Sequence, residues 1–249
     1  MNQLSDALRR FAGHRTIVIA SDFDGTLSDH GPDLGAATPV PGAEQALNEL
    51  ARRPNVTVML ISGRRLADLL PRFDALAGEI ITVGEHGAEW PGADREAHPY
   101  VDLLASGLAE IAADVEGALV ERKQSGVTMR HRRVEQHRVE QLLHEAAGFL
   151  REATMDLDPA PRIEFGRGVI DVSLVSTTKG DAVESVRTSK GASAVLYFGD
   201  DVSDESVFEV MSASDVGVKV GVAQSRAAYR VEKPRTVVGV LEELLSLRQ

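Results

Sequence analysis

Two acidic residues near the N-terminus have the types and spacing needed for covalent catalysis: Asp22 and Asp24, in the stretch SDFDGTL at 21–27. Carboxylates two positions apart on one loop can project into the same cleft, where one attacks as a nucleophile and the other serves as acid and base. Gly25 allows a sharp turn whose backbone N–H groups can face a phosphate. Taken alone, the pattern also fits a solvated turn or part of a calcium loop. The strand-like run before it and the Thr-Leu pair after it favour the catalytic interpretation.

Three other segments carry groups that complement such a nucleophile. Ser62, with Gly63 and Arg64 after it, ends a second apolar run, and its hydroxyl and backbone N–H can hold phosphate oxygens at a helix N-terminus. Lys179 can neutralise phosphate charge from the start of another helix. By itself, each is better explained as a helix cap or a surface lysine. The acidic segment GDDVSDE at 199–205 has no nearby cation in the sequence, so we predict a bound Mg²⁺, with a solvated acidic turn as the alternative.

Buried strands must carry these loops, and short apolar runs supply them. The run at 16–20 is β-branched and is followed by Asp and Gly residues, which is typical of a buried parallel strand. Strands that alternate with helices at this spacing predict βαβ units and a mostly parallel sheet, with ligands at the carboxyl ends of the strands. The expected strands are 16–20, 56–61, 79–83, 194–198 and 215–220, and the expected helices are 43–52, 65–73 and 203–212.

The middle of the chain has a different pattern, in which helices alternate with hairpins. Turn residues at 124–126 and 166–168 separate pairs of short strand-like runs. The predicted fold class is therefore α/β: a Rossmann-like core formed by 1–96 and 177–249, with an α+β cap domain inserted at 97–176. The expected cap helices are 101–115 and 135–151, and its expected strands are 118–123, 127–132, 162–165 and 169–173.

Composition and charge exclude several other classes of protein. The chain has 249 residues, of which 43% are hydrophobic and 26% charged, as is ordinary for a globular protein. It has no cysteine, so disulfides and thiolate chemistry are excluded. The net charge of -11 argues against nucleic acid or an anionic membrane as a partner, and no apolar run approaches the roughly 18 residues that span a bilayer. We expect a cytoplasmic monomer that acts on a small molecule.

The four motifs, in this order and on these strand ends, resemble those of the haloacid dehalogenase-like superfamily. The resemblance implies that Asp22 forms an aspartyl-phosphate, while Asp24 protonates the leaving alcohol and then activates water. It also implies that Ser62 and Lys179 hold the phosphoryl oxygens. The implied ligands of Mg²⁺ are Asp22, Asp24 through its backbone carbonyl, Asp200 and, through water or indirectly, Asp204.

A narrower resemblance covers nearly the whole chain. The segment VGEHGAE at 83–89, together with the acidic segment 199–205, is similar to segments of trehalose-6-phosphate phosphatases, and the insertion falls where that family carries its cap. The pair Glu121 and Lys123, followed by a strand that ends in Arg132, is similar to the cap motif that contacts the sugar. The resemblance implies a sugar phosphate as substrate. The implied substrate-binding residues are Gly63, Arg64, His86, Glu121, Lys123, Arg130, Arg132 and Asp171.

The departures from that family pattern all concern the substrate. Arg130 and His131 stand where His and Tyr are usual, Asp171 stands where Glu is usual, and Glu85 stands where Asn is usual. The missing methylene at Asp171 moves a carboxylate by roughly an ångström, enough to change its hydrogen bonds to sugar hydroxyls. The pattern therefore indicates the chemistry more sharply than the substrate.

We predict Mg²⁺-dependent hydrolysis of trehalose 6-phosphate, with the phosphate on the core and the sugar against the cap. The same chemistry on another sugar phosphate, including a sucrose phosphate, a glycosyl-glycerate phosphate or a trehalose-like pseudo-disaccharide phosphate, stays open because the cap residues differ. A non-catalytic sugar-phosphate sensor is disfavoured, because a binding module needs no proton-transferring residue at Asp24. Dehalogenation is disfavoured because that branch of the superfamily does not use this metal site.

Overall fold

The chain forms two compact units in a computed structural model that describes residues 3–29, 36–93, 96–166 and 168–248. The first unit comprises Met1–Pro91 and Thr177–Gln249, and the second comprises Gly92–Ser176. The first unit contains a parallel sheet with helices, and the second contains a separate antiparallel sheet. This confirms the fold class predicted from the sequence. Within the described residues, no helix combines the length and the apolar character required to cross a bilayer.

The sheet of the first unit has six strands in the order β10-β9-β8-β1-β2-β3, and every neighbouring pair is parallel. Its central strands are buried along their whole length, which is why they appear in the sequence as continuous apolar runs rather than alternating patterns. The strands are β1 (Ile17–Ser21), β2 (Val56–Ile61), β3 (Ile81–Val83), β8 (Ala194–Gly199), β9 (Val216–Val220) and β10 (Tyr229–Val231).

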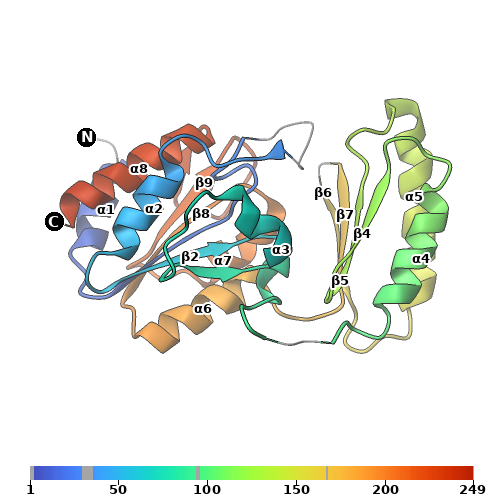
Figure 1. Ribbon diagram of the computed structural model, residues 1–249, viewed down its shortest axis with the longest axis horizontal. Helices are drawn as coiled ribbons and strands as arrows, with labels where there is room; N and C mark the ends of the chain where they lie inside the picture. The colour runs from blue at the N-terminus through green and yellow to red at the C-terminus, as the bar shows by residue number, and fades with distance from the viewer. Residues whose placement is uncertain (1–2, 30–35, 94–95, 167, 249) are drawn as a thin grey trace. The chain divides into compact units, whose positions relative to one another are not determined.

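Helices cover both faces of this sheet (Figure 1). Successive residues of a strand point to opposite faces. Ile17 and Ile19 pack in one apolar cluster with α1, α2, α3 and α8, whereas Val18 and Ala20 pack in another with α6 and α7. The helices are α1 (Gln3–Ala12), α2 (Ala43–Ala51), α3 (Leu66–Leu69), α6 (Lys179–Lys190), α7 (Glu205–Val210) and α8 (Pro234–Leu247), with 3-10 turns η2 (Leu70–Arg72), η3 (Glu85–Gly87) and η4 (Val202–Asp204).

The strand order creates a topological switch between β1 and β8. After β1 the chain continues to β2 and β3 on one side, whereas β9 and β10 follow β8 on the other side. Ligands of open α/β sheets bind outside the carboxyl ends of the strands at such a switch. Asp22 directly follows β1 and Asp200 directly follows β8, so both acidic motifs lie at this position.

The second unit is a four-stranded antiparallel sheet, in the order β4-β5-β7-β6, with two helices packed on one face (Figure 1). Val127, Met129, Ile170 and Val172 of its central strands join the helices in one apolar cluster. The elements are α4 (Val101–Ala112), β4 (Leu119–Arg122), β5 (Gly126–Arg130), α5 (Gln136–Thr154), β6 (Arg162–Gly166) and β7 (Val169–Ser173).

Local structure differs from the sequence-based expectation in two places near the site. The helix expected at 65–73 is a single turn, α3, followed by the 3-10 turn η2, because Pro71 cannot donate the hydrogen bond that would continue an α-helix. The helix expected from 203 begins as the 3-10 turn η4 at Val202, which a capping box between Asp201 and Asp204 initiates, and it becomes α-helical at Glu205. Elements α1, β10 and α8 have no counterpart among the expected ones.

Candidate active site

The nucleophile predicted from the sequence, Asp22, is buried against a lysine at the carboxyl end of β1. Its backbone N–H donates to the carbonyl of Phe198 on β8 at 2.9 Å, which anchors the loop to both central strands. Lys179 Nζ donates to Asp22 Oδ1 at 2.7 Å and to Asp204 Oδ1 at 2.7 Å. Thr178 caps α6 through a reciprocal pair of hydrogen bonds with Asp181, which fixes where that helix, and therefore Lys179, begins.

Burial and charge set the protonation of this group. Burial raises the pKa of Asp22 well above its ordinary value. Lys179 acts in the opposite direction, but its charge is shared between Asp22 and Asp204. Repulsion from the carboxylates of Asp204 and Asp200 raises the Asp22 pKa further. Burial opposes the charged form of Lys179, but the carboxylates of Asp204 and Asp22 outweigh it and raise the Lys179 pKa. Burial likewise opposes the ionised form of Asp204, but Lys179 outweighs it and lowers the Asp204 pKa. The site therefore holds more negative charge than its lysine can neutralise.

Asp204 is held by hydrogen bonds on both of its carboxylate oxygens. Oδ1 accepts from Lys179 Nζ and, at 2.6 Å, from the hydroxyl of Tyr197. Oδ2 accepts from the backbone N–H groups of Asp200 and Asp201 at 2.8 and 2.9 Å. A carboxylate offers about four lone-pair positions, and these bonds use them. Asp204 therefore serves to position the loop and Lys179 rather than to supply a free ligand atom.

Three carboxylates at the switch lie close enough to hold a metal ion. One oxygen each from Asp22, Asp200 and Asp204 lies within 4.8 Å of the others. Asp200 is only partly buried, and its Oδ1 accepts from the hydroxyl of Thr26 at 3.2 Å. Hard oxygen donors around an excess of negative charge suit a divalent cation such as Mg²⁺. With Asp204 already hydrogen-bonded on both oxygens, Asp22 and Asp200 are the side chains that fit direct coordination.

Asp24, the predicted acid and base, is paired with Arg64 in a two-point contact. Arg64 Nε donates to Asp24 Oδ2 and a terminal guanidinium N–H donates to Oδ1, both at 2.6 Å. Asp24 retains 26% exposure of its side chain, whereas Arg64 is 6% exposed and lies over the ring of Phe23 at 5.7 Å. The structure thus brings two predicted site residues together in an arrangement that the sequence did not reveal.

The segment after β2 packs against the turn η3. The N–H of His86 donates to the carbonyl of Ser62 at 2.9 Å, and Ser62 Oγ accepts from the N–H of Arg64 at 3.2 Å. A Cβ atom at Gly63 would lie 2.5 Å from the His86 ring, so glycine is needed to admit the imidazole. Glu85 and His86 have φ of 47° and 56°, a left-handed conformation that non-glycine residues adopt at a cost.

In the second unit, predicted sugar-binding residues lie on the sheet face opposite the helices. Glu121, Thr128 and Asp171 are direct partners across β4, β5 and β7, and directly paired residues share one face. Thr128 alternates along its strand with Val127 and Met129, which pack beneath the helices. We call the residues Glu121, Thr128 and Asp171 the polar row.

Two cations pair with the acidic members of the polar row. Lys123 is almost fully buried, and its Nζ donates to Asp171 Oδ1 at 2.7 Å. Arg130 donates to Glu121 Oε2 at 2.7 Å. Arg132 lies just beyond β5 and is partly exposed. The structure thus joins four of the predicted cap residues in two ion pairs on one face of the sheet.

A family model for trehalose-phosphatases matches residues 20–235. The chain belongs to the trehalose-phosphatase family. A trehalose-phosphate phosphatase of Mycolicibacterium paratuberculosis is 32% identical over 273 residues, which cover 98% of this chain and 67% of the relative. An uncharacterized glycosyl hydrolase of Mycobacterium tuberculosis is also 32% identical, over 97% of this chain. This chain spans only about a fifth of that relative's length, 19%.

Two solved structures have the same fold as this trehalose-phosphatase family member. The C-terminal domain of a C. albicans trehalose-6-phosphate phosphatase superposes with a TM-score of 0.85 over 98% of this chain and 97% of that domain, at 19% identity. The C-terminal domain of a Candida albicans trehalose synthase regulatory protein superposes with a TM-score of 0.68 over 95% and 97%, at 14% identity. At these identities the likeness establishes the fold alone.

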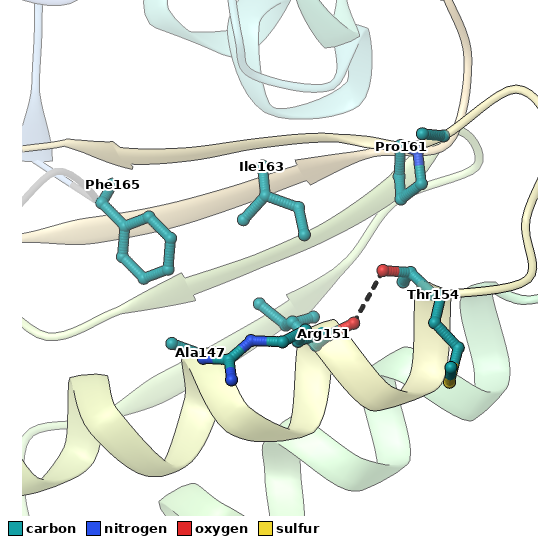
Figure 2. Close-up of a pocket in the computed structure, with 9 residues that line it drawn as sticks. Ala147, Arg151, Thr154, Pro161, Ile163 and Phe165 are labelled. Carbon is teal, nitrogen blue, oxygen red and sulfur yellow. Dashed lines mark hydrogen bonds between the residues drawn. The ribbon is translucent and has the colours of Figure 1, made fainter.

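The second unit of this family member also contains a groove (Figure 2). It has a volume of about 490 Å³ and lies between α5 and β6, with Ile163 and Phe165 on the strand side. Arg151 and Thr154 lie on the helix, and the Thr154 hydroxyl donates to the Leu150 carbonyl at 2.7 Å. Among the residues that the structure describes, those lining the groove include no carboxylate and none of the site residues predicted from the sequence.

Two buried residues at the candidate site of this trehalose-phosphatase family member were not predicted from the sequence. Tyr197 on β8 donates to Asp204, and burial together with the charge of Asp204 raises its pKa, so the hydroxyl keeps its proton. Lys219 on β9 is 2% exposed, with Nζ 3.4 Å from the Asp201 carbonyl and 3.5 Å from Glu205 Oε1. A charged residue inside the apolar run VGVKV was the available signal for Lys219. A tyrosine within an apolar strand carries no such signal.

Proposed function

We propose that this chain is a Mg²⁺-dependent phosphatase that hydrolyses trehalose 6-phosphate to trehalose and phosphate. The observation that carries the proposal is the buried contact of Lys179 with both Asp22 and Asp204 at the topological switch. This contact places the carboxylate of Asp22, the nucleophile that we propose, beside a cation that can hold a phosphoryl oxygen. Membership of the trehalose-phosphatase family, and relatives named as trehalose-phosphate phosphatases, support the same reaction.

A sugar-phosphate sensor is the competing proposal, because a regulatory protein's domain shares the fold. Fold alone therefore does not decide between binding and catalysis. The side chains favour catalysis: a buried Asp22 whose carboxylate meets a lysine, and a partly exposed Asp24 two residues later. A protein that only binds a sugar phosphate gains nothing from a second carboxylate able to transfer a proton.

In the first half of the reaction, a carboxylate oxygen of Asp22 attacks the phosphorus atom, and the bond between phosphorus and the sugar oxygen breaks. Asp24 donates a proton to that oxygen, so the sugar leaves as a neutral alcohol and the phosphoryl group stays on Asp22. Because both oxygens of Asp24 accept from Arg64, Arg64 must release at least one, and that oxygen must take up a proton from solvent, before this transfer. Its guanidinium is then available to a phosphoryl oxygen.

In the second half, Asp24 is a carboxylate and removes a proton from water. The water oxygen attacks phosphorus, the bond to Asp22 breaks, and phosphate leaves with both aspartates restored to their starting states. Lys179 and Ser62 hold the phosphoryl oxygens in both halves. When bound, Mg²⁺ would favour the ionised form of Asp22, against the rise in its pKa that burial causes, and would offset the charge of the carboxylates and the phosphoryl group as they approach.

Replacing Asp200 with asparagine is expected to weaken Mg²⁺ binding by at least about tenfold, because the neutral amide is a poorer ligand for a hard cation. Calorimetric titration of Mg²⁺ into the wild type and the variant measures this without any turnover. Asp114→Asn, which removes an exposed carboxylate of the second unit, is the matched control. Equal affinities for wild type and Asp200→Asn would remove Asp200 from the metal site.

Replacing Asp171 with asparagine is expected to raise KM for trehalose 6-phosphate about tenfold, because we propose that the polar row hydrogen-bonds the sugar hydroxyls. Turnover of a small aryl phosphate, which has no sugar, should change by less than about twofold. Steady-state kinetics on both substrates measure the difference, and Asp156→Asn at an exposed position is the control. Equal losses on both substrates would contradict a role in sugar recognition.

Release of phosphate from a panel of substrates with Mg²⁺ tests the proposed function. The panel comprises trehalose 6-phosphate, sucrose 6-phosphate, glucose 6-phosphate, a glycosyl-glycerate phosphate and an aryl phosphate. A strong preference for trehalose 6-phosphate is expected. Hydrolysis of the aryl phosphate with weak turnover of trehalose 6-phosphate would point to another sugar phosphate, and tight binding without turnover of any ester would favour the sensor.

A further inference from the structure

The hydroxyl of Tyr197 lies inside the apolar interior, three residues before Asp200 in the chain. Its ring is fully buried on β8, and the ring of Phe208 on α7 packs edge-on against it with centroids 5.6 Å apart. Residues Ala182 and Val183 of α6 belong to the same apolar cluster. These contacts would be satisfied equally by phenylalanine, so packing alone gives no reason for a hydroxyl at this position.

Among the residues that the structure describes, the Tyr197 hydroxyl has one hydrogen-bond partner, Asp204, which also binds Lys179. It donates to Asp204 Oδ1 at 2.6 Å, and the same oxygen accepts from Lys179 Nζ at 2.7 Å. Lys179 extends the chain of contacts to Asp22 Oδ1 at 2.7 Å. An ammonium group on a flexible four-carbon stem has three rotatable donors, so its position depends on acceptors that are themselves fixed.

We propose that Tyr197 is a positioning residue: its hydroxyl holds Asp204 Oδ1 in the orientation that sets Lys179 against Asp22. The packed ring fixes the direction of the hydroxyl, the hydroxyl fixes the carboxylate, and the carboxylate fixes the ammonium. Packing in the apolar interior thereby determines the position of the Lys179 ammonium group when the phosphoryl group is transferred. This inference rests on the proposed phosphatase function and adds to it a residue that never touches the substrate.

Replacing Tyr197 with phenylalanine is expected to lower kcat about tenfold or more while KM changes by less than about threefold. Preorganised charge matters most where charge develops in the transition state, and a small displacement of a catalytic group is costly there. The matched control is Tyr229→Phe, the same chemical change on β10 in the same sheet, which should leave both constants unchanged. Thermal melts of both variants check that the fold is kept.

A second comparison separates positioning from a general loss of structure. If Tyr197 acts through Asp204, the phenylalanine substitution should cost less than about twofold in an Asp204→Asn background, because residues that act as a unit are not additive. Wild-type kcat in Tyr197→Phe, the same fold-loss in both backgrounds, or a variant that no longer folds would each overturn the inference. A wild-type protein that hydrolyses no phosphate ester would overturn the proposed function as well.

Discussion

Replacing Asp22 with asparagine is expected to abolish phosphate release, with kcat lowered by at least about 10³-fold on every substrate. The amide keeps the size of the carboxylate and can still accept from Lys179, but its oxygen cannot attack phosphorus to form the covalent intermediate. Initial rates with trehalose 6-phosphate and an aryl phosphate measure the loss. Asp114→Asn should retain wild-type rates, and substantial turnover by Asp22→Asn would mean that another group is the nucleophile.

The same substitution should make the metal-free protein more stable at neutral pH. Burial raises the pKa of Asp22 above that of the unfolded chain, so folding favours the protonated form. The corresponding stability is present below the unfolded pKa of about 3.9 and is lost as pH rises toward the folded pKa. With metal chelated at pH 7, Asp22→Asn should therefore melt at a higher temperature than the wild type. The difference in melting temperature between Asp22→Asn and the wild type should disappear near pH 4. A lower melting temperature for Asp22→Asn than for the wild type at pH 7 would contradict the excess of negative charge assigned to the site.

Replacing Asp24 with asparagine should separate the two halves of the reaction. A sugar is a poor leaving group and needs a proton, so kcat for trehalose 6-phosphate should fall by about 10²–10⁴-fold. A nitrophenolate leaves without a proton, so the first half should survive with an aryl phosphate. The second half still needs a base, and the phosphoryl group should accumulate on Asp22.

Rapid mixing of Asp24→Asn with nitrophenyl phosphate should therefore give a burst of about one nitrophenolate per protein, followed by slow turnover. Asp22→Asn is the control, because without the nucleophile it should show neither burst nor turnover. Equal losses of Asp24→Asn on the sugar and aryl substrates, with linear release from the start, would show that Asp24 transfers no proton.

The strands that carry the chemistry were predictable because they are buried on both faces. Continuous apolar runs located β1 and β2, and the acidic motifs after such strands indicated the carboxyl edge of the sheet. Three elements were not predicted: α1, α8 and β10. The two helices carry apolar residues at helical spacing, such as Leu4, Leu8 and Phe11 of α1, so their signal was present in the sequence, whereas β10 has three residues and is too short to show a period. What the sequence does not give is how the two helices contact each other: Arg248, which follows α8, donates to the carbonyl of Ala12 at the end of α1.

The sequence offered the residue types of the candidate site, but it did not offer their pairings. Motif spacing placed Asp22, Asp24, Arg64 and Lys179 at the site, but no periodicity indicates that Arg64 would hold both oxygens of Asp24. The sequence also suggested that the acidic segment 199–205 lacks a nearby cation, whereas Lys179 and Lys219 reach it from α6 and β9. Such contacts join residues far apart in the chain and become visible only when the sheet is assembled.

The most direct test of catalysis through Asp22 is to trap the phosphoryl group on the protein. Wild-type protein, Mg²⁺ and substrate labelled in the phosphate are mixed, quenched in acid within milliseconds, treated with borohydride and digested for mass spectrometry. Label in the quenched protein and a borohydride-reduced side chain at Asp22 alone are the expected results, with both increased in Asp24→Asn. Phosphate released at the full rate with no label on the protein, or a reduced side chain at another residue, would contradict covalent catalysis through Asp22.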